Sequence, residues 1–252
     1  MLVHGYRSSG RIWRLVQEAL DPTRFRSLAL SNRGAGDSER TAAEADYTVE
    51  SLRPGPLRRD AKLLGRRDFT LVGHSMGGAR STQFALDHPE LRAGPGPAEP
   101  CAAGRPCPVR ELGATDSGGV RQRVECRRMW RRTLPHVPEE FRQALQADIA
   151  RNPIERALGG RRSMASLRLR QRLQELPMPV CVVGGDQDTT VGVHNILAEY
   201  LALPEAPASS CTCSTASAIR PTWRWPRAAP GVLDRLRVPD GARCLASGRS
   251  LR

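Results

Sequence analysis

Short apolar runs alternate with longer amphipathic stretches along the chain. The apolar runs are "MLVHGY" at residues 1–6, Leu28 to Leu30, Phe69 to Val72 and Val180 to Val183. Each run is short and leads into glycine or polar residues, a pattern typical of strands buried in a sheet. The pattern therefore predicts four strands.

Between these runs, apolar residues recur at helical spacing. Phe141, Leu145 and Ile149 stand at i, i+4 and i+8, so they share one face of a helix. Similar patterns predict helices in "SGRIWRLVQEAL", in "MGGARSTQFALDHPE" and in "VHNILAEYLALPEA". Strands that alternate with helices predict an α/β fold, in which a mostly parallel sheet is flanked by helices.

Three stretches depart from this pattern: residues 52–61, 91–127 and 206–252. All three are rich in Arg, Pro or Gly and have no apolar period. Such a composition is typical of linkers or disordered segments. The remaining residues are enough for one domain of ordinary size.

The high positive charge of the chain has two possible explanations. A net charge of +13 and a pI near 10.7 are typical of proteins that bind nucleic acid or an anionic surface. However, Lys62 is the only lysine among 39 basic residues, and arginine excess with many Pro and Gly is typical of GC-rich coding DNA. We therefore expect no nucleic-acid partner.

Other features exclude further classes of protein. Seven cysteines, an odd number with no signal peptide, do not form a disulfide framework, and Cys211-x-Cys213 lacks the second pair that a zinc site needs. No apolar run is long enough to span a bilayer, and "NRGAGDSER" lacks the spacing of a dinucleotide site. We expect a cytoplasmic protein with a small-molecule substrate and with no metal, cofactor or membrane partner.

Gly73-His74-Ser75-Met76-Gly77 has the Gly-x-Ser-x-Gly spacing of a nucleophile elbow. A predicted strand precedes it and a predicted helix follows, which is the context that the motif requires. In such a turn the serine hydroxyl is exposed, and the backbone N–H of Met76 faces a developing oxyanion. We predict Ser75 as the nucleophile and Met76 as one oxyanion donor.

Two further loops complete the predicted site. His4-Gly5 follows the first strand, so the backbone N–H of Tyr6 is predicted as the second oxyanion donor and His4 as a residue that shapes the loop. Asp186 and Asp188 follow the strand at 180–183, where a carboxylate could orient a histidine. A solvated acidic turn is the alternative interpretation of these two residues.

"LVHGY", "LALSNRGAGDSER", "DFTLVGHSMGGARSTQFALDHPE" and "MPVCVVGGDQDTTV" together resemble the α/β-hydrolase fold superfamily, in its serine-hydrolase branch. The resemblance implies the order Ser, acid, His, and favours Asp188 over Asp186 as the acid. It implies a hydrolase that acts on an ester-like or other carbonyl substrate. It also implies a core at 1–92 and 176–205 and a helical cap at 128–175, with aberrant stretches at 93–127 and 206–252.

Two parts of that family pattern are missing from the sequence. The chain starts at what resembles the third strand of the fold, so we expect it to be truncated at its N-terminus. No histidine follows Asp188 at the position the family uses. The five histidines are His4, His74, His88, His136 and His194.

A shift of reading frame is our hypothesis for the missing histidine. Read one base earlier, codons for residues 211–225 can encode "LHVLHGIGHSPNVEV", a strand followed by a Gly-His loop. Read one base later, the codons near 52–61 and 94–97 can encode a helix and a strand, respectively. The alternatives to a working serine hydrolase are a decayed, non-catalytic relative and, more remotely, an arginine-rich nucleic-acid binder.

Overall fold

The computed structural model describes residues 1–49, 51, 68–89, 92–95, 138–176, 178, 180–185, 193–203 and 210–214. Its strands are β1 (Leu2–Val3), β2 (Ala29–Leu30), β3 (Asp68–Gly73), β4 (Arg92–Pro95), β5 (Cys181–Gly185) and β6 (Ser210–Ser214). Its α-helices are α1 (Arg14–Ala19), α3 (Met76–Asp87), α5 (Glu139–Ala150), α6 (Ile154–Ser166) and α7 (Val193–Tyr200). Three 3₁₀ helices are η1 (Gly10–Trp13), η2 (Glu44–Tyr47) and η3 (Leu169–Glu175).

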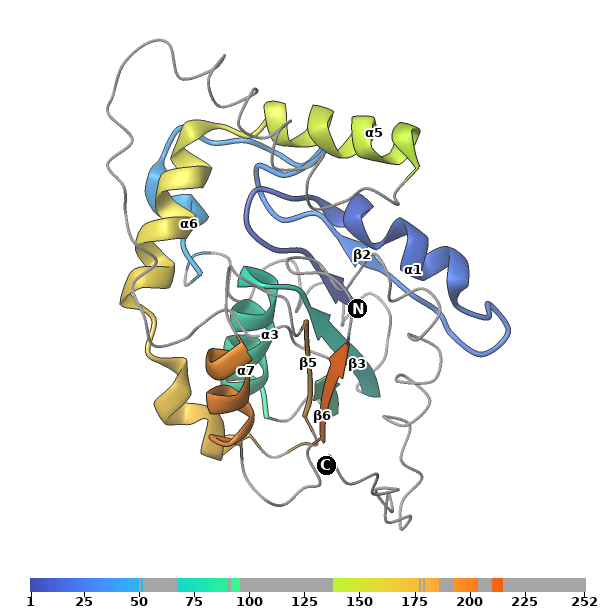
Figure 1. Ribbon diagram of the computed structural model, residues 1–252. Helices are drawn as coiled ribbons and strands as arrows, with labels where there is room; N and C mark the ends of the chain where they lie inside the picture. Colours follow the sequence, from blue (N-terminus) through green and yellow to red (C-terminus); the bar gives the residue numbers. More distant parts are fainter. Residues whose placement is uncertain are drawn as a thin grey trace.

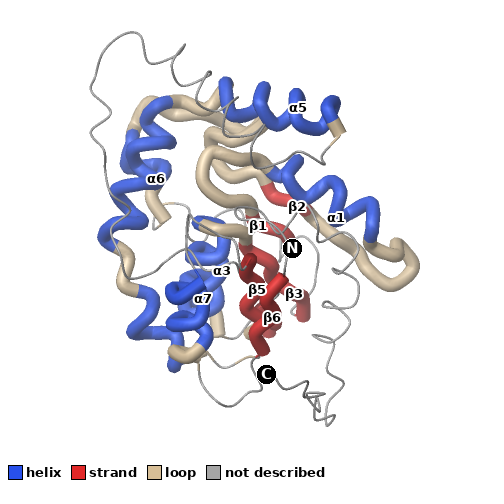
Figure 2. The backbone as a smooth tube through the Cα atoms, viewed as in Figure 1, coloured by secondary structure: helices blue, strands red, loops and turns tan. Residues whose placement is uncertain are grey.

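The strands form parallel sheets, as the sequence predicts. One sheet has the order β2-β1-β3-β4, and β5 pairs with β6; every pairing is parallel. Helices cover both sides of the strands, with α3 and α7 on one side and α1 on the other (Figures 1 and 2). The predicted α/β class is therefore confirmed.

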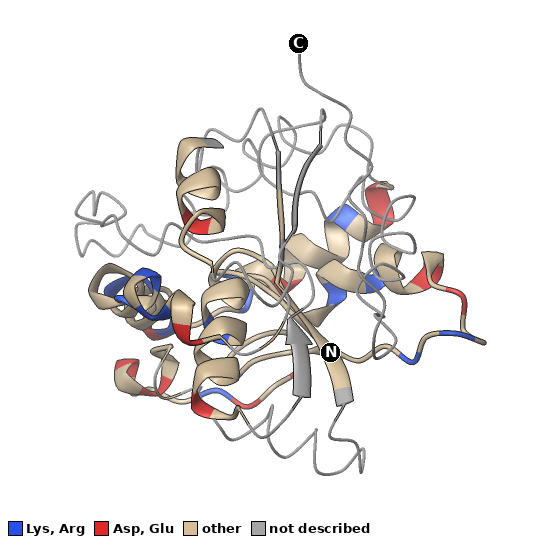
Figure 3. Ribbon diagram, turned by 90° about the horizontal axis from the view of Figure 1, so that it is seen from below, with Lys and Arg blue, Asp and Glu red and all other residues tan. Residues whose placement is uncertain are grey.

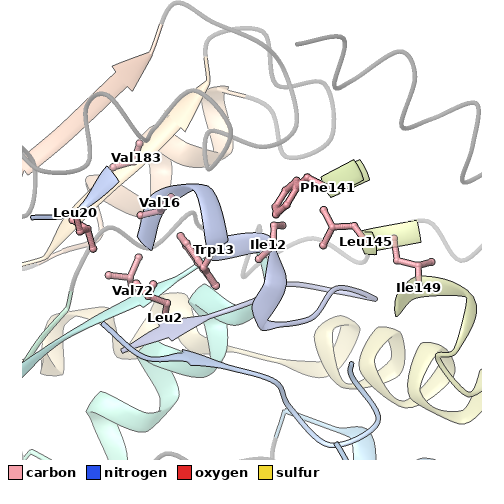
Figure 4. Packing of buried hydrophobic residues seen from close by; sticks show 10 residues of the cluster. All are labelled: Leu2, Ile12, Trp13, Val16, Leu20, Val72, Phe141, Leu145, Ile149 and Val183. Atoms are coloured by element: carbon pink, nitrogen blue, oxygen red, sulfur yellow. The ribbon is translucent and has the colours of Figure 1, made fainter. Parts of the chain in front are cut away.

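Successive strand residues face opposite layers, because side chains alternate along a strand. Leu2 and Val72 lie in a core cluster with Trp13 and Val16, whereas Val3 and Leu71 lie in a cluster with Phe84 of α3. The first cluster is shown in Figure 4.

Helix α5 adds its predicted apolar face to the first of these clusters. Phe141, Leu145 and Ile149 are all buried, and they pack with Ile12 and Trp13 of η1 (Figure 4). The i, i+4, i+8 pattern is thus confirmed. This packing attaches residues 138–150 to η1, the 3₁₀ helix that follows β1.

Strands β4 and β6 lie in stretches that the sequence analysis sets apart as aberrant. Arg92–Pro95 pairs with β3, and Ser210–Ser214 pairs with β5. Neither segment has the apolar composition of a buried strand. Because ladder hydrogen bonds join backbone groups, strand pairing tolerates such side chains at the margin of a sheet.

Candidate active site

Ser75 occupies the sharp turn between β3 and α3. Its backbone has φ +53° and ψ −124°, a conformation that L-residues with side chains rarely adopt. The two glycines of the motif allow the turn to be this tight. A Cβ at Gly73 would lie 2.5 Å from the carbonyl oxygen of Gly77, and a Cβ at Gly77 would lie 2.4 Å from that of Val3.

The loop after β1 lies directly against this turn. Val3 pairs with Gly73, and the backbone N–H of His74 donates to the carbonyl of Val3 at 3.0 Å. A Cβ on Gly5 would lie 3.0 Å from the Cβ of Ser75. Only glycine allows this approach, so the structure brings the predicted oxyanion loop and the predicted nucleophile together.

Backbone strain is concentrated at these two loops. Among the described residues, Arg7 and Ser75 are the non-glycine residues with positive φ, at +52° and +53°. Strained conformations of this kind cost of order 1–3 kcal/mol and cluster at functional sites. The pairing of both outliers at one place supports a functional role for this edge of the sheet.

Four polar contacts fasten the loop at residues 6–9 to α5, to α6 and to the turn between them. The tethers are Tyr6 Oη to Ala157 O at 3.1 Å, Asn152 Nδ2 to Arg7 O at 3.3 Å, Arg156 Nη2 to Ser8 O at 3.2 Å and Ser9 Oγ to Asp148 Oδ2 at 2.5 Å. Each loop residue thus has a partner from the helical segment that the sequence analysis assigns to a cap.

The side chains of both predicted oxyanion residues meet α6. A Cβ on Gly160 would lie 3.3 Å from Met76 Sδ and 3.6 Å from a ring carbon of Tyr6. Met76 belongs to a buried cluster with Leu167, and Tyr6 packs against that cluster. As the first residue of α3, Met76 also has a backbone N–H with no acceptor inside the helix. These contacts fix the positions of the two predicted donors.

His4 is buried and has both ring nitrogens engaged. Its Nδ1 lies 2.8 Å from the carbonyl oxygen of Gly5, and its Nε2 accepts the backbone N–H of Asn32 at 3.1 Å. Burial, and next the charge of Arg156, lower the pKa of His4 well below its ordinary value. A neutral imidazole with the proton on Nδ1 fits this geometry, and it joins the loop after β1 to Asn32.

The structure does not bring a described histidine into hydrogen-bond contact with the Ser75 hydroxyl. His74 is buried with its ring edge-on to Trp13, at 6.5 Å between centroids. His88 contacts Phe84 with tilted rings, 4.8 Å between centroids, at the far end of α3, roughly 20 Å along the helix from Ser75. His194 is exposed at the start of α7. Asp186, Asp188 and His136 lie outside the described residues.

Two buried arginines flank the site, and the sequence analysis missed both. Arg80 on α3 is 5% exposed and Arg156 on α6 is 3% exposed. Burial lowers the pKa of Arg80 to about 9 and that of Arg156 to about 10, so both remain cationic at neutral pH. The spacing of residues in the sequence indicates that Arg80 is buried. Met76, Arg80 and Phe84 stand at i, i+4 and i+8, so they share the buried face of α3.

The described residues contain neither a membrane-spanning helix nor a cluster of metal-binding side chains. No helix there has the length and apolarity to cross a membrane, and no group of three or more His, Cys, Asp or Glu could hold a metal ion. Arginine and acidic residues alternate over the same helices and loops (Figure 3).

Residues 1–93, which contain β1, the loop that follows it and the Gly-x-Ser-x-Gly turn, match the family model described as alpha/beta hydrolase fold. The putative carbamate hydrolase RutD of Escherichia coli O157:H7 is 32% identical over 89 residues, which are 35% of this chain and 32% of that protein. The curated relatives are matched over about a quarter to a third of their own length.

Solved structures match over nearly the whole chain. The esterase RhEst1 from Rhodococcus sp. ECU1013 superposes with a TM-score of 0.72 at 18% identity, over 93% of this chain and 90% of that one. A thermophilic esterase from Thermogutta terrifontis gives a TM-score of 0.71 at 21% identity, over 94% and 89%. Motif, sheet and superposition agree that the chain has the α/β-hydrolase fold, and residues 1–93 match the family of that description.

Proposed function

We propose that the chain is a serine hydrolase in which Ser75 attacks an ester-like carbonyl of a small molecule. The observation that carries this proposal is the strained elbow at Ser75 with Gly5 packed against it. A serine is held at positive φ at the carboxyl end of a parallel strand, where ligands bind in open α/β sheets.

In the proposed reaction, the Ser75 hydroxyl adds to the carbonyl carbon and its proton passes to a base. The carbonyl oxygen becomes an oxyanion, which the backbone N–H groups of Tyr6 and Met76 stabilise. Loss of the alcohol gives an acyl-enzyme that water then hydrolyses. Removing one such oxyanion donor from a hydrolase typically costs 10²–10³ in rate, so the packing of this loop matters.

The orienting acid in this proposal is Asp188, with Asp186 as the alternative. Both follow β5, which is parallel to β6. The ordinary role of such a carboxylate is to hold a histidine in the correct tautomer and to stabilise its cation. The identity of the base is the open part of the proposal, because His4 is committed to Gly5 and Asn32.

A second candidate is a non-catalytic relative that retains the elbow. Beyond Asp188 the sequence has one histidine, His194, which lies at the start of α7 rather than after a further strand, and this observation favours the second candidate. Hydrolases that lose a triad member retain about 10³–10⁴-fold catalysis over water from the oxyanion hole and binding. The two candidates therefore differ in rate.

Hydrolysis of p-nitrophenyl acetate and butyrate, measured against Ser75→Ala, tests the proposal. The serine hydrolase predicts turnover that Ser75→Ala abolishes. Equal rates for both proteins would contradict it and favour the non-catalytic relative. The matched control is Ser9→Ala, which removes a serine hydroxyl that bonds Asp148 rather than one at the elbow.

Ser75→Gly tests the strain independently of turnover. Glycine adopts φ +53° without a steric penalty, so Ser75→Gly should be about 1 kcal/mol more stable than Ser75→Ala, and both should be inactive. Urea unfolding of the two variants measures the difference. Equal stability would show that residue 75 is not strained in solution.

A further inference from the structure

Arg80 and Arg156 are two buried cations beside the same loop. Arg156 donates to the carbonyl of Ser8 at 3.2 Å and to the side-chain oxygen of Asn152. Arg80 Nη1 is fully buried and has no hydrogen-bond partner among the described residues. The helices that carry the two arginines are in contact, because a Cβ on Gly160, one turn after Arg156, would lie 3.3 Å from Sδ of Met76, one turn before Arg80.

Neither arginine is paired with a carboxylate in the described part of the chain. The acceptors of Arg156 are a carbonyl and an amide oxygen, both neutral. The neighbours that raise its pKa are Tyr6 and Tyr47, and Arg7 lowers it further. Burying an unpaired charge is costly, and buried cations are ordinarily compensated by an anion. The described protein groups do not supply that anion.

The position of this pair is close to the predicted reaction centre. Arg80 stands one turn beyond Gly77, whose Cβ position lies 2.6 Å from the carbonyl oxygen of His4. Both arginines lower the pKa of His4, which adjoins Gly5 and so the elbow. An anion between α3 and α6 would therefore lie beside the loop that carries Tyr6.

We propose that Arg80 and Arg156 form a buried subsite for a carboxylate group, and that the substrate of Ser75 is an ester or lactone carrying such a group. The second clause rests on the proposed function. A guanidinium presents a planar fork of N–H donors that matches the two oxygens of a carboxylate. Two such forks with a free donor favour a carboxylate over an uncharged acyl chain.

Binding measured without chemistry tests the subsite. Hexanoate and its neutral amide, hexanamide, are titrated into Ser75→Ala protein at constant ionic strength by calorimetry and by thermal melting. Hexanoate should bind and raise Tm, whereas hexanamide should do neither. Arg80→Met and Arg156→Met should each weaken hexanoate binding at least tenfold. Arg80→Lys keeps the positive charge but not the forked guanidinium, so its affinity for hexanoate should lie between those of the parent and Arg80→Met.

Arg162→Met is the matched control, because Arg162 lies on the same helix as Arg156 but is 73% exposed and paired with Glu44. It should bind hexanoate as the parent does. Absence of hexanoate binding, or unchanged binding in Arg80→Met, would overturn the proposal. Equal protection by chloride or inorganic phosphate would also overturn it, by showing an inorganic anion site.

Failure of the subsite and failure of the hydrolase give different results. Hexanoate binding requires no nucleophile, so it persists if Ser75 proves unreactive. If esters are hydrolysed at Ser75 but hexanoate binding is unaffected by Arg80→Met, the hydrolase stands and the subsite is wrong. Wild-type protein should then also show no preference for mono-p-nitrophenyl glutarate over p-nitrophenyl butyrate.

Discussion

Two groups of buried charges flank the loop at residues 6–9, and they are compensated very differently. Asp148 is 2% exposed and is surrounded by donors: Arg11 Nε at 3.0 Å, Arg151 Nη2 at 2.6 Å and the Ser9 hydroxyl at 2.5 Å. Arg80 and Arg156 are equally buried but have no carboxylate among the described residues.

This difference distinguishes charges that stabilise the fold, around Asp148, from charges that are available to a ligand, on Arg80 and Arg156. The Asp148 cluster connects α5 to η1 and, because Arg11 and Arg151 also bond Asp37 at 3.0 and 3.1 Å, to the loop after β2. Every oxygen of Asp148 is used within the fold, so its charge fixes structure. The arginine pair leaves a donor unused, which is what a group intended for a ligand requires.

Asp148→Ala should produce the largest change in stability. It removes two hydrogen bonds to a charged group, each of which contributes about 1.5–3 kcal/mol, and the ion pair with Arg11, but the two arginines are half-exposed and can be resolvated. We expect a loss of about 3 kcal/mol in the free energy of unfolding, measured by urea denaturation. Asp148→Asn is the isosteric control and should lose less. A loss below about 1 kcal/mol would show that the cluster does not hold α5 in place.

The arginine pair should respond to pH in the opposite sense from a paired charge. Burial lowers the pKa of Arg80 from its ordinary value to about 9, so above about pH 9 the unfolded chain holds more protons than the folded chain and stability rises with pH. At pH 10, one unit above the folded pKa, the gain is about 1.4 kcal/mol relative to neutral pH.

The charge of Arg156 also bears on the titration of Arg80, and Tyr6, Arg7 and Tyr47 bear on that of Arg156, so the measurement is a difference. Subtracting the pH profile of Arg80→Met isolates the contribution of Arg80. The parent should gain stability relative to this variant from pH 8 to pH 10. Parallel profiles would show that Arg80 is compensated in solution and would remove the contrast with Asp148.

Ser9→Ala should have the smallest of these effects. It removes one hydroxyl donor to Asp148 but leaves both arginines, so we expect a loss of about 1 kcal/mol by thermal unfolding. The esterase rate should change little if Ser9 only supports the scaffold. A large fall in rate with unchanged stability would instead place Ser9 in the reaction.

The sequence predicted the layers of this fold better than its polar contacts. Phe141, Leu145 and Ile149 reveal α5 because apolar periodicity is a local property of the chain. The Gly-x-Ser-x-Gly motif likewise identifies its own turn, since the glycines and the serine are adjacent. The close approach of Gly5 to Ser75 follows from the parallel pairing of β1 and β3. Both strands are predicted from the sequence, so this approach is predictable too.

The tethers could not be predicted in this way. Ser9 bonds Asp148 and Tyr6 bonds Ala157 across 139 and 151 residues of sequence, and no period links such positions. Arg80 was overlooked for another reason. Arginine excess was interpreted as a property of composition, although one arginine in an apolar stripe at i, i+4 and i+8 is a local signal of a buried charge.

Phosphonylation of Ser75 tests the central claim most directly. A fluorophosphonate reagent requires an exposed nucleophilic serine and an oxyanion hole, and peptide mass spectrometry locates its adduct. We predict an adduct on the peptide containing Ser75 in the parent protein and none in Ser75→Ala. An unlabelled parent, or equal labelling of Ser75→Ala, would contradict the assignment of Ser75 as the nucleophile.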